Sequence, residues 1–137
     1  MESRICDITP VWRLYDFTDT RAASVIAEWL HEEKVSKRDI GQLNQKLDML
    51  ALAGPDLPPK LLAGPIHKHI YKLIIHGDRM LRPMLCKGPF DMGGEYTLLI
   101  GAIEVNGRLD RDPAEAETNR TILLANQRRK KAESWAI

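Results

Sequence analysis

The side chains best suited to chemistry in this chain are cations within, or just after, residues 69–105, a stretch of three apolar runs. Arginine keeps its charge and offers a planar fork of donors that matches phosphate oxygens, whereas histidine and lysine can transfer protons when their pKa values are tuned. The candidates for catalysis are Lys72, His76, Arg79 and Arg82. The candidates for contacts with a phosphate backbone are Lys87, Arg108 and Arg111.

The three apolar runs predict strands over residues 70–75, 80–86 and 96–105. They are rich in isoleucine, leucine, tyrosine and valine, and glycine and proline bound them. Because short connections make neighbouring strands antiparallel, the stretch is predicted to be a three-stranded meander. His69 and Lys72 lie three residues apart on the first strand, so only one of them can face a common site.

A further strand is predicted over residues 11–17, which are β-prone and alternate imperfectly. It would pair with the meander and make the sheet four-stranded. A first helix is predicted over residues 21–34, with N-cap residues at positions 18–20. Apolar residues spaced three and four apart, Trp29 and Leu30 among them, form one stripe that has to be buried.

A second helix is predicted from Ser36, which opens a sequence with capping-box spacing, to about residue 53. Its apolar stripe includes Leu43 and Leu47. Two amphipathic helices joined by a short link predict a helical hairpin packed on the sheet. Residues 54–66 contain four of the eight prolines and predict an extended connection to the meander.

The end of the chain predicts a third helix. Asp112 supplies an N-cap and Pro113 the first helical position, and the helix is predicted to run to about residue 131, followed by a tail with Trp135. Residues 1–137 then form one α+β domain: a small, mostly antiparallel four-stranded sheet packed by an N-terminal helical hairpin and a C-terminal helix.

The composition bounds the possible partners. With 137 residues, 44% hydrophobic and 28% charged, the chain is typical of a soluble domain, and its net charge of +1 does not indicate general affinity for nucleic acid. Cys6 and Cys86 have neither disulfide-framework nor metal-site spacing. No run approaches the roughly 20 apolar residues of a membrane span, and no signal peptide is recognisable. We therefore expect a cytoplasmic protein without metal or other cofactor.

The order of the predicted elements resembles the RelE/ParE toxin superfamily, and within it the HigB, phage Gp49-like branch. Four short motifs carry the resemblance, which covers roughly residues 11–125. IYKLI at 70–74 lies on the first meander strand, LR at 81–82 on the second and TLLIGA at 97–102 on the third, and PAEAE at 113–117 opens the last helix.

The resemblance implies the toxin half of a type II toxin–antitoxin pair, a ribosome-dependent endonuclease that cleaves mRNA without a metal ion. A base takes the 2′-OH proton, cations stabilise the pentavalent phosphate, and an acid protonates the leaving 5′-oxygen. Arg82 falls on the family's arginine of the second strand, the expected phosphate clamp. The implied partners are the ribosome, mRNA and an antitoxin of the helix-turn-helix kind that covers the basic face, with no membrane and no small-molecule cofactor.

The chain departs from the family at two basic positions, and these departures keep other functions open. The family's arginine on the first meander strand falls on Ile74, and its lysine pair after the third strand falls on Glu104 and Val105. A carboxylate at position 104 would repel an RNA substrate. A non-catalytic interaction module of phage or prophage origin is one alternative, and a gyrase-directed toxin resembling ParE is another.

Overall fold

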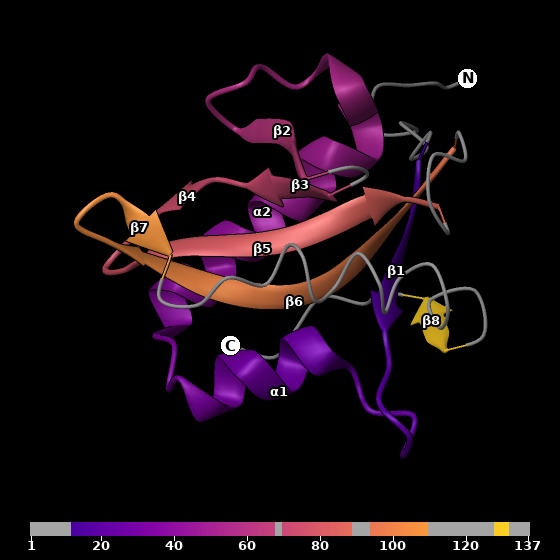
Figure 1. The fold of residues 1–137 in the computed structure, drawn as a ribbon, viewed down its shortest axis with the longest axis horizontal. Helices are drawn as coiled ribbons and strands as arrows, with labels where there is room; N and C mark the ends of the chain where they lie inside the picture. Colours follow the sequence, from indigo (N-terminus) through magenta and orange to yellow (C-terminus); the bar gives the residue numbers. More distant parts are fainter. Residues whose placement is uncertain (1–11, 68–69, 89–93, 110–127, 132–137) are drawn as a thin grey trace, which may run out of the picture.

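The structure is a computed structural model that describes residues 12–67, 70–88, 94–109 and 128–131. Within these residues, two α-helices pack on a mixed, mostly antiparallel sheet of eight strands, which is an α+β arrangement (Figure 1). The strand order is β2-β3-β5-β6-β1-β8, with β4 paired to β5 and β7 paired to β6. In chain order the elements are β1 (Arg13–Phe17), α1 (Val25–Glu32), α2 (Lys37–Ala53), a 3-10 helix (Gly54–Asp56), β2 (Leu62–His67), β3 (Ile70–Leu73), β4 (Ile75–His76), β5 (Met80–Lys87), β6 (Glu95–Val105), β7 (Arg108–Leu109) and β8 (Arg129–Lys131).

The predicted meander is confirmed. β3 and β4 pair antiparallel with β5, and β5 pairs antiparallel with β6. The first predicted strand is divided in two at Ile74, whose N–H donates to the carbonyl of Leu61 at 2.9 Å. Beyond β6, Asn106 and Gly107 both have positive φ, which suits a two-residue hairpin turn. This turn produces β7, a strand that was not among the four predicted from the sequence.

The predicted N-terminal strand is β1, which lies between β6 and β8. It runs parallel to β6, with Leu14 across from Tyr96, and antiparallel to β8. A parallel pairing is possible because a long crossover with both helices separates β1 from β6. The prediction of four strands was too low, because the proline-rich connection supplies β2 and residues after the meander supply β7 and β8.

The prediction that a C-terminal helix runs to residue 131 was wrong at its end. Arg129–Lys131 form β8, which pairs with β1. The Arg129 guanidinium lies 4.1 Å from the Tyr15 ring centroid and 2.9 Å from a Glu95 carboxylate oxygen. Such tertiary contacts override local helix propensity. The predicted start of that helix, with Asp112, lies outside the described residues, as does Trp135.

The first helix begins later than predicted. Its N-cap is Ser24, whose Oγ accepts from the N–H of Ala27 at 3.1 Å. Asp19, which the sequence predicted among the N-cap residues, instead closes the preceding turn, because its carboxylate accepts from the N–H groups of Arg21 and Ala23. The hydrogen bond from the backbone N–H of Ala23, together with those from Arg21, lowers the pKa of Asp19 to about 2 from the usual 3.8.

The second helix starts as predicted. Ser36 is its N-cap and accepts from the N–H of Asp39 at 3.1 Å. The helix ends at Gly54, where φ is positive and where a Cβ would overlap the Trp12 indole. Glycine is therefore needed there both for its backbone conformation and for the close approach of Trp12.

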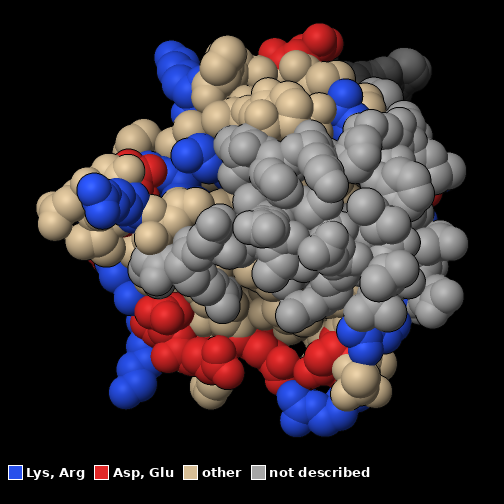
Figure 2. All heavy atoms as spheres, viewed as in Figure 1, with Lys and Arg blue, Asp and Glu red and all other residues tan. Residues whose placement is uncertain are grey.

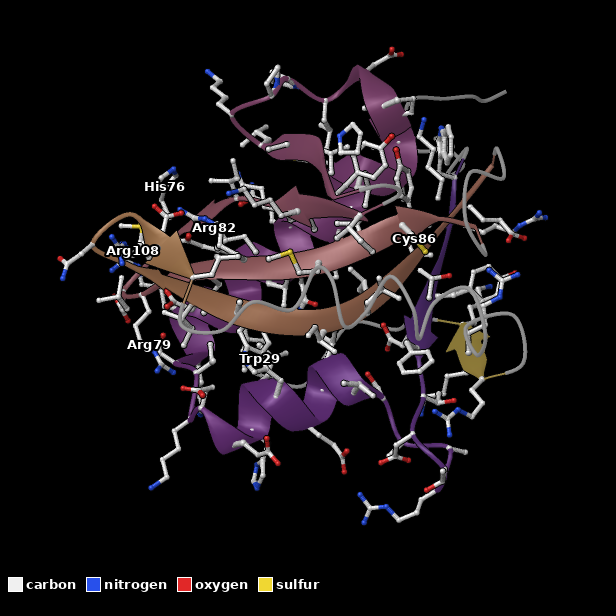
Figure 3. All side chains as sticks on the ribbon, viewed as in Figure 1. Trp29, His76, Arg79, Arg82, Cys86 and Arg108 are labelled. Atoms are coloured by element: carbon white, nitrogen blue, oxygen red, sulfur yellow. The ribbon has the colours of Figure 1, made fainter. Side chains whose placement is uncertain are left out.

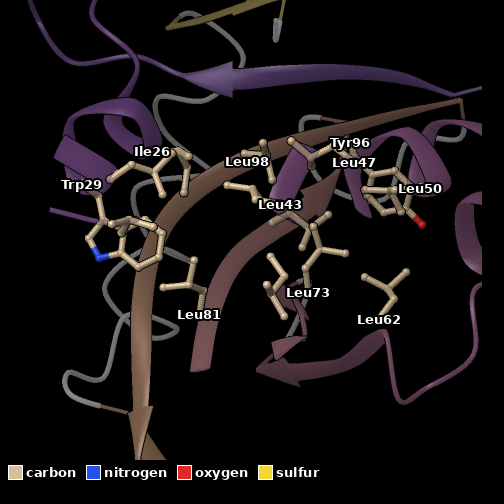
Figure 4. Packing of buried hydrophobic residues seen from close by; sticks show 14 of the residues in the cluster. Ile26, Trp29, Leu43, Leu47, Leu50, Leu62, Leu73, Leu81, Tyr96 and Leu98 are labelled. Atoms are coloured by element: carbon tan, nitrogen blue, oxygen red, sulfur yellow. The ribbon is translucent and has the colours of Figure 1, made fainter. Parts of the chain in front are cut away.

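Both helices pack on one face of the sheet, which we call the helical face (Figure 4). Trp29 of α1 covers Gly101 of β6 so closely that a Cβ at Gly101 would overlap its ring. Leu43 and Leu47 of α2 are buried, as predicted. The other face, which we call the opposite face, has its own buried apolar cluster: Phe17, Ile70, Met84, Cys86, Leu99 and Ala102.

Candidate functional site

The strand register brings three of the predicted catalytic residues to the opposite face. Residues directly across from each other in a sheet share a face, and alternate residues of one strand share a face. Lys72 of β3 lies across from Met84, and His76 of β4 lies across from Met80. Arg82 stands between these two methionines on β5 at the same alternation. Lys72, His76 and Arg82 therefore share the opposite face. Figure 3 shows His76 and Arg82 at the end of the sheet near β4 and β7.

The fourth predicted catalytic residue, Arg79, is directed to α1 and α2 instead. Its Nη1 lies 3.1 Å from a carboxylate oxygen of Glu33, and its Nη2 donates to the Glu33 carbonyl. Its backbone N–H donates to Asp39 at 3.1 Å. Figure 3 shows Arg79 toward α1, away from His76 and Arg82. The structure thus does not bring Arg79 together with the other three residues.

The predicted phosphate-binding residues do not join this site either. Lys87 lies across from Tyr96, a residue of the helical-face core, and its Nζ is 5.6 Å from the centroid of the Tyr71 ring. Arg108 is exposed on β7 across from Val105, the neighbour of Glu104, and so shares the helical side of the sheet. Arg111 lies outside the described residues.

Charge is unevenly distributed around this end of the molecule. Figure 2 shows Lys and Arg side chains beside β7, and acidic side chains gathered along the edge where α1 lies. The acidic side chains of α1 include Glu28 and the exposed Glu32. An anionic ligand would therefore be attracted to the β4–β7 end and repelled from α1.

Arg82 is buried and held in a fixed orientation. Its side chain is 5% exposed, and its Nε donates to Oε1 of Glu104 at 2.9 Å. Its Nη1 donates to the carbonyl of Leu81 at 2.9 Å and to that of Ile75 at 3.2 Å. Among the described residues, no group accepts from Nη2. The guanidinium is consequently fixed by β4, β5 and β6, and these described strands leave Nη2 without an acceptor.

Glu104 neutralises much of the positive charge at this site. Arg82 lies across from Ala102, so Glu104 is its diagonal neighbour on the same face. The Glu104 side chain is 30% exposed and is the part of the pair that solvent reaches. From its position in the sequence, Glu104 was expected only to repel RNA. Its direct ion pair with Arg82 depends on the register between β5 and β6, which no local signal specifies.

His76 is the exposed member of the group. Its Nδ1 lies 3.3 Å from the Met80 sulfur, a weak acceptor, and no described residue pairs with Nε2. An exposed imidazole with a free ring nitrogen can exchange protons with a bound substrate or water. His76 is therefore better placed for proton transfer than the buried Arg82.

Asp39 is a buried residue three positions after Ser36, at the end of the sequence with capping-box spacing. It is 1% exposed, and its carboxylate accepts from the N–H groups of Asp78 at 2.8 Å and Arg79 at 3.1 Å. A Cβ at Gly77 would overlap the Asp39 carboxylate, so glycine is required at that position. Asp39 thus anchors the turn between β4 and β5 to α2, and this turn follows directly after His76.

A second charged cluster occupies the other end of β6. Glu95 pairs with Arg129 at 2.9 Å and with Arg13 at 3.2 Å, and Arg129 also donates to Thr97 at 3.3 Å. Glu95 and Arg129 are largely buried side chains, 7% and 15% exposed. Their charges are used to attach β8 to the sheet, so this cluster is structural. Residues 13, 95 and 129 are far apart in sequence, and no motif predicted their contact.

Comparison of the chain with family models, curated proteins and solved structures finds no match. Across the described ranges, no group of three His, Cys, Asp or Glu side chains could hold a metal ion. None of the helices in that part of the chain combines the length and apolar character that a membrane crossing requires. The opposite face with Lys72, His76 and Arg82 is therefore the basis for inferring a function.

Proposed function

We propose that this chain is the toxin component of a type II toxin–antitoxin pair and that it cleaves mRNA on the ribosome. The observation that carries the proposal is the shared face of Lys72, His76 and Arg82, which groups a proton-transfer residue with two cations. The element order supports it, with a strand, two helices and an antiparallel meander, as in the RelE-like fold that the sequence resembles.

The three residues have complementary roles in this reaction. Arg82 contacts the scissile phosphate, and its bonds to two carbonyls keep the guanidinium oriented before the substrate arrives, which favours transition-state stabilisation. His76 exchanges a proton with the attacking 2′-oxygen or the leaving 5′-oxygen. Lys72, half-buried on β3, adds a second positive charge for the RNA backbone.

The partners follow from the same proposal. The ribosome presents the mRNA, and the reaction takes place in the cytoplasm. An antitoxin of the helix-turn-helix kind covers the face with Arg82 and keeps the toxin inactive until the antitoxin is removed. In such a pair, co-expression of the adjacent gene protects the cell from the toxin.

Induced expression in a bacterium without any neighbouring gene tests this function. Growth should stop, and incorporation of labelled amino acids should fall before incorporation of labelled thymidine does. Expression of the His76→Gln variant to the same soluble level should permit growth. Normal growth at high soluble expression of the wild type would contradict the toxin proposal. A replication block with normal translation would instead support the gyrase-directed alternative.

A second candidate is a non-catalytic interaction module, and the ion pair of Arg82 with Glu104 favours it. A side chain that is 5% exposed and bonded to a carboxylate is typical of a structural arginine. In this case the same expression experiment would leave growth unaffected, and purified protein would leave ribosome-bound mRNA intact.

A further inference from the structure

The ion pair between Arg82 and Glu104 uses only half of one edge of the guanidinium. The Nε and Nη2 nitrogens of an arginine form a fork that can hold two oxygens of a carboxylate or phosphate at once. In this structure Oε1 of Glu104 takes Nε, and no described group accepts from Nη2. The other nitrogen, Nη1, is committed to the carbonyls of Ile75 and Leu81. Within the described part of the chain, Glu104 is therefore the only anion on this edge of the fork, and it occupies half of that edge.

Glu104 is the more solvent-accessible member of its ion pair with Arg82. Its side chain is 30% exposed, whereas that of Arg82 is 5% exposed. Solvent thus reaches the Glu104 side chain more readily than it reaches the Arg82 side chain. A ligand for Arg82 has to replace this carboxylate or share the fork with it.

We propose that Glu104 is a built-in competitor for anions at Arg82, and that a phosphodiester of single-stranded RNA binds by displacing it and taking both Nε and Nη2. The proposal rests on the proposed function for the identity of the anion. A bidentate contact has geometry that the single Glu104 contact lacks, so displacement is favourable when the RNA is held by further contacts. Glu104 then lowers the affinity for RNA that makes no such contacts.

The variant Glu104→Gln removes the competing charge with little change in shape. The glutamine oxygen can still accept from Nε, so Arg82 keeps its orientation while its charge is no longer neutralised. The matched control is Glu32→Gln, which causes the same change in net charge at an exposed position of α1. A general electrostatic effect on RNA affinity would be equal in the two variants.

Fluorescence anisotropy with a labelled single-stranded RNA tests the proposal on the full chain. The probe carries 2′-O-methyl riboses, which cannot supply the attacking 2′-hydroxyl, so binding is measured without cleavage. Glu104→Gln should tighten binding by about tenfold relative to wild type, the effect of roughly one charge-assisted contact, and Glu32→Gln by less than about twofold. Equal affinities of the two variants would overturn the proposal.

If the proposal is correct, the gain in RNA affinity of Glu104→Gln depends on Arg82, which no longer pairs with a carboxylate in that variant. In the double variant Arg82→Lys with Glu104→Gln, most of the gain should disappear, because lysine has no fork. Thermal unfolding of every variant confirms that folded protein is compared. Retention of the full gain in this double variant would overturn the proposal. So would an equal gain for a labelled oligoglutamate peptide, because the site would then not distinguish RNA from acidic protein.

The binding assay separates this inference from the proposed function. Tighter RNA binding by Glu104→Gln, with no cleavage of ribosome-bound mRNA by any variant, would support the competitor role and contradict the nuclease. Cleavage by the wild type, with no gain in binding for Glu104→Gln, would support the nuclease and contradict the competitor role.

Discussion

The carboxylate of Asp39 in α2 accepts a hydrogen bond at 2.8 Å from the backbone N–H of Asp78, in the turn between β4 and β5. The same carboxylate accepts from the N–H of Arg79 at 3.1 Å, and Asp39 is 1% exposed. One acidic side chain in the first turn of a helix thus determines where the hairpin that follows His76 lies. Through this contact, Asp39 also helps to fix the position of the exposed His76, which directly precedes the turn.

Replacing Asp39 should therefore destabilise the domain. Asp39→Ala removes the carboxylate that accepts from two partly buried N–H groups, and we expect a loss of about 2–4 kcal/mol in the free energy of unfolding. Urea denaturation of the purified variant measures this loss. The control is Asp48→Ala, an exposed position of the same helix, which should change stability by less than about 0.5 kcal/mol. Equal effects of the two substitutions would show that the buried carboxylate does not anchor the turn.

The packing of α2 on the helical face predicts a similar contrast between two leucines. Leu47 is 5% exposed in the core and Leu52 is 45% exposed on the same helix. Leu47→Ala should cost about 2–5 kcal/mol, because it removes buried methyl groups and leaves a cavity, whereas Leu52→Ala should cost much less. Thermal or urea unfolding of both variants provides the comparison. A small loss for Leu47→Ala would mean that α2 does not pack on the sheet in solution.

Tyr96 predicts a dependence of stability on pH. Burial raises the pKa of the Tyr96 phenol to about 12, with a smaller contribution from Tyr71, whereas the usual value is 10.0. In the unfolded chain the phenol loses its proton near pH 10, and in the folded protein it resists this loss. The contribution of Tyr96 to stability should therefore be constant below about pH 10 and decrease as the pH rises from 10 toward 12.

The variant Tyr96→Phe isolates this contribution. Its hydroxyl is buried, and among the described residues it has no hydrogen-bond partner, so the substitution should be neutral or slightly stabilising at pH 7. Above pH 10 the variant should lose less stability than the wild type does. Parallel pH profiles of unfolding free energy for the two proteins would contradict the assignment.

His76 predicts a loss of activity without a loss of stability. The side chain is exposed, so His76→Gln should change the unfolding free energy by less than about 0.5 kcal/mol. Because His76 is the proposed proton-transfer residue, its replacement by Gln should lower mRNA cleavage by about 100-fold or more. Lys37→Gln, an exposed substitution at the start of α2, is the control for nonspecific effects. Undiminished cleavage by His76→Gln would remove the histidine from the reaction.

Local patterns predicted the elements whose determinants lie close together in sequence. The hydrogen bond of Ser36 to Asp39 and the spacing of Leu43 and Leu47 act within one helix, and α2 was found as predicted. The residues of β8 have the local pattern of a helix. They form a strand because Arg129 contacts Glu95 and Tyr15, which are distant in sequence. Long-range contacts thus determined the departure at β8, whereas β7 follows from the local turn at Asn106 and Gly107.

The candidate site, too, was predictable from the sequence only where local patterns determine it. Alternation along the strands predicted that His69 and Lys72 face opposite sides of the sheet, and His69 lies outside the described residues. Alternation was not enough to assign Arg79 and Arg82 to different sides of the sheet. That assignment required the turn at Gly77, which Asp39 fixes from another element. The pairing of Arg82 with Glu104 likewise required the register of β5 against β6.

Cleavage of ribosome-bound mRNA by the wild type and by Arg82 variants tests the central claim most directly. Arg82→Ala should lower cleavage by about 100- to 1000-fold, the usual effect of removing one preorganised donor. Arg82→Lys should restore only part of the activity, because a point charge lacks the bidentate fork. Loss of a buried pair also costs stability, so the three proteins are compared at equal concentrations of folded chain. Equal cleavage by all three, or no cleavage by the wild type, would contradict the claim that this face of the meander cleaves RNA.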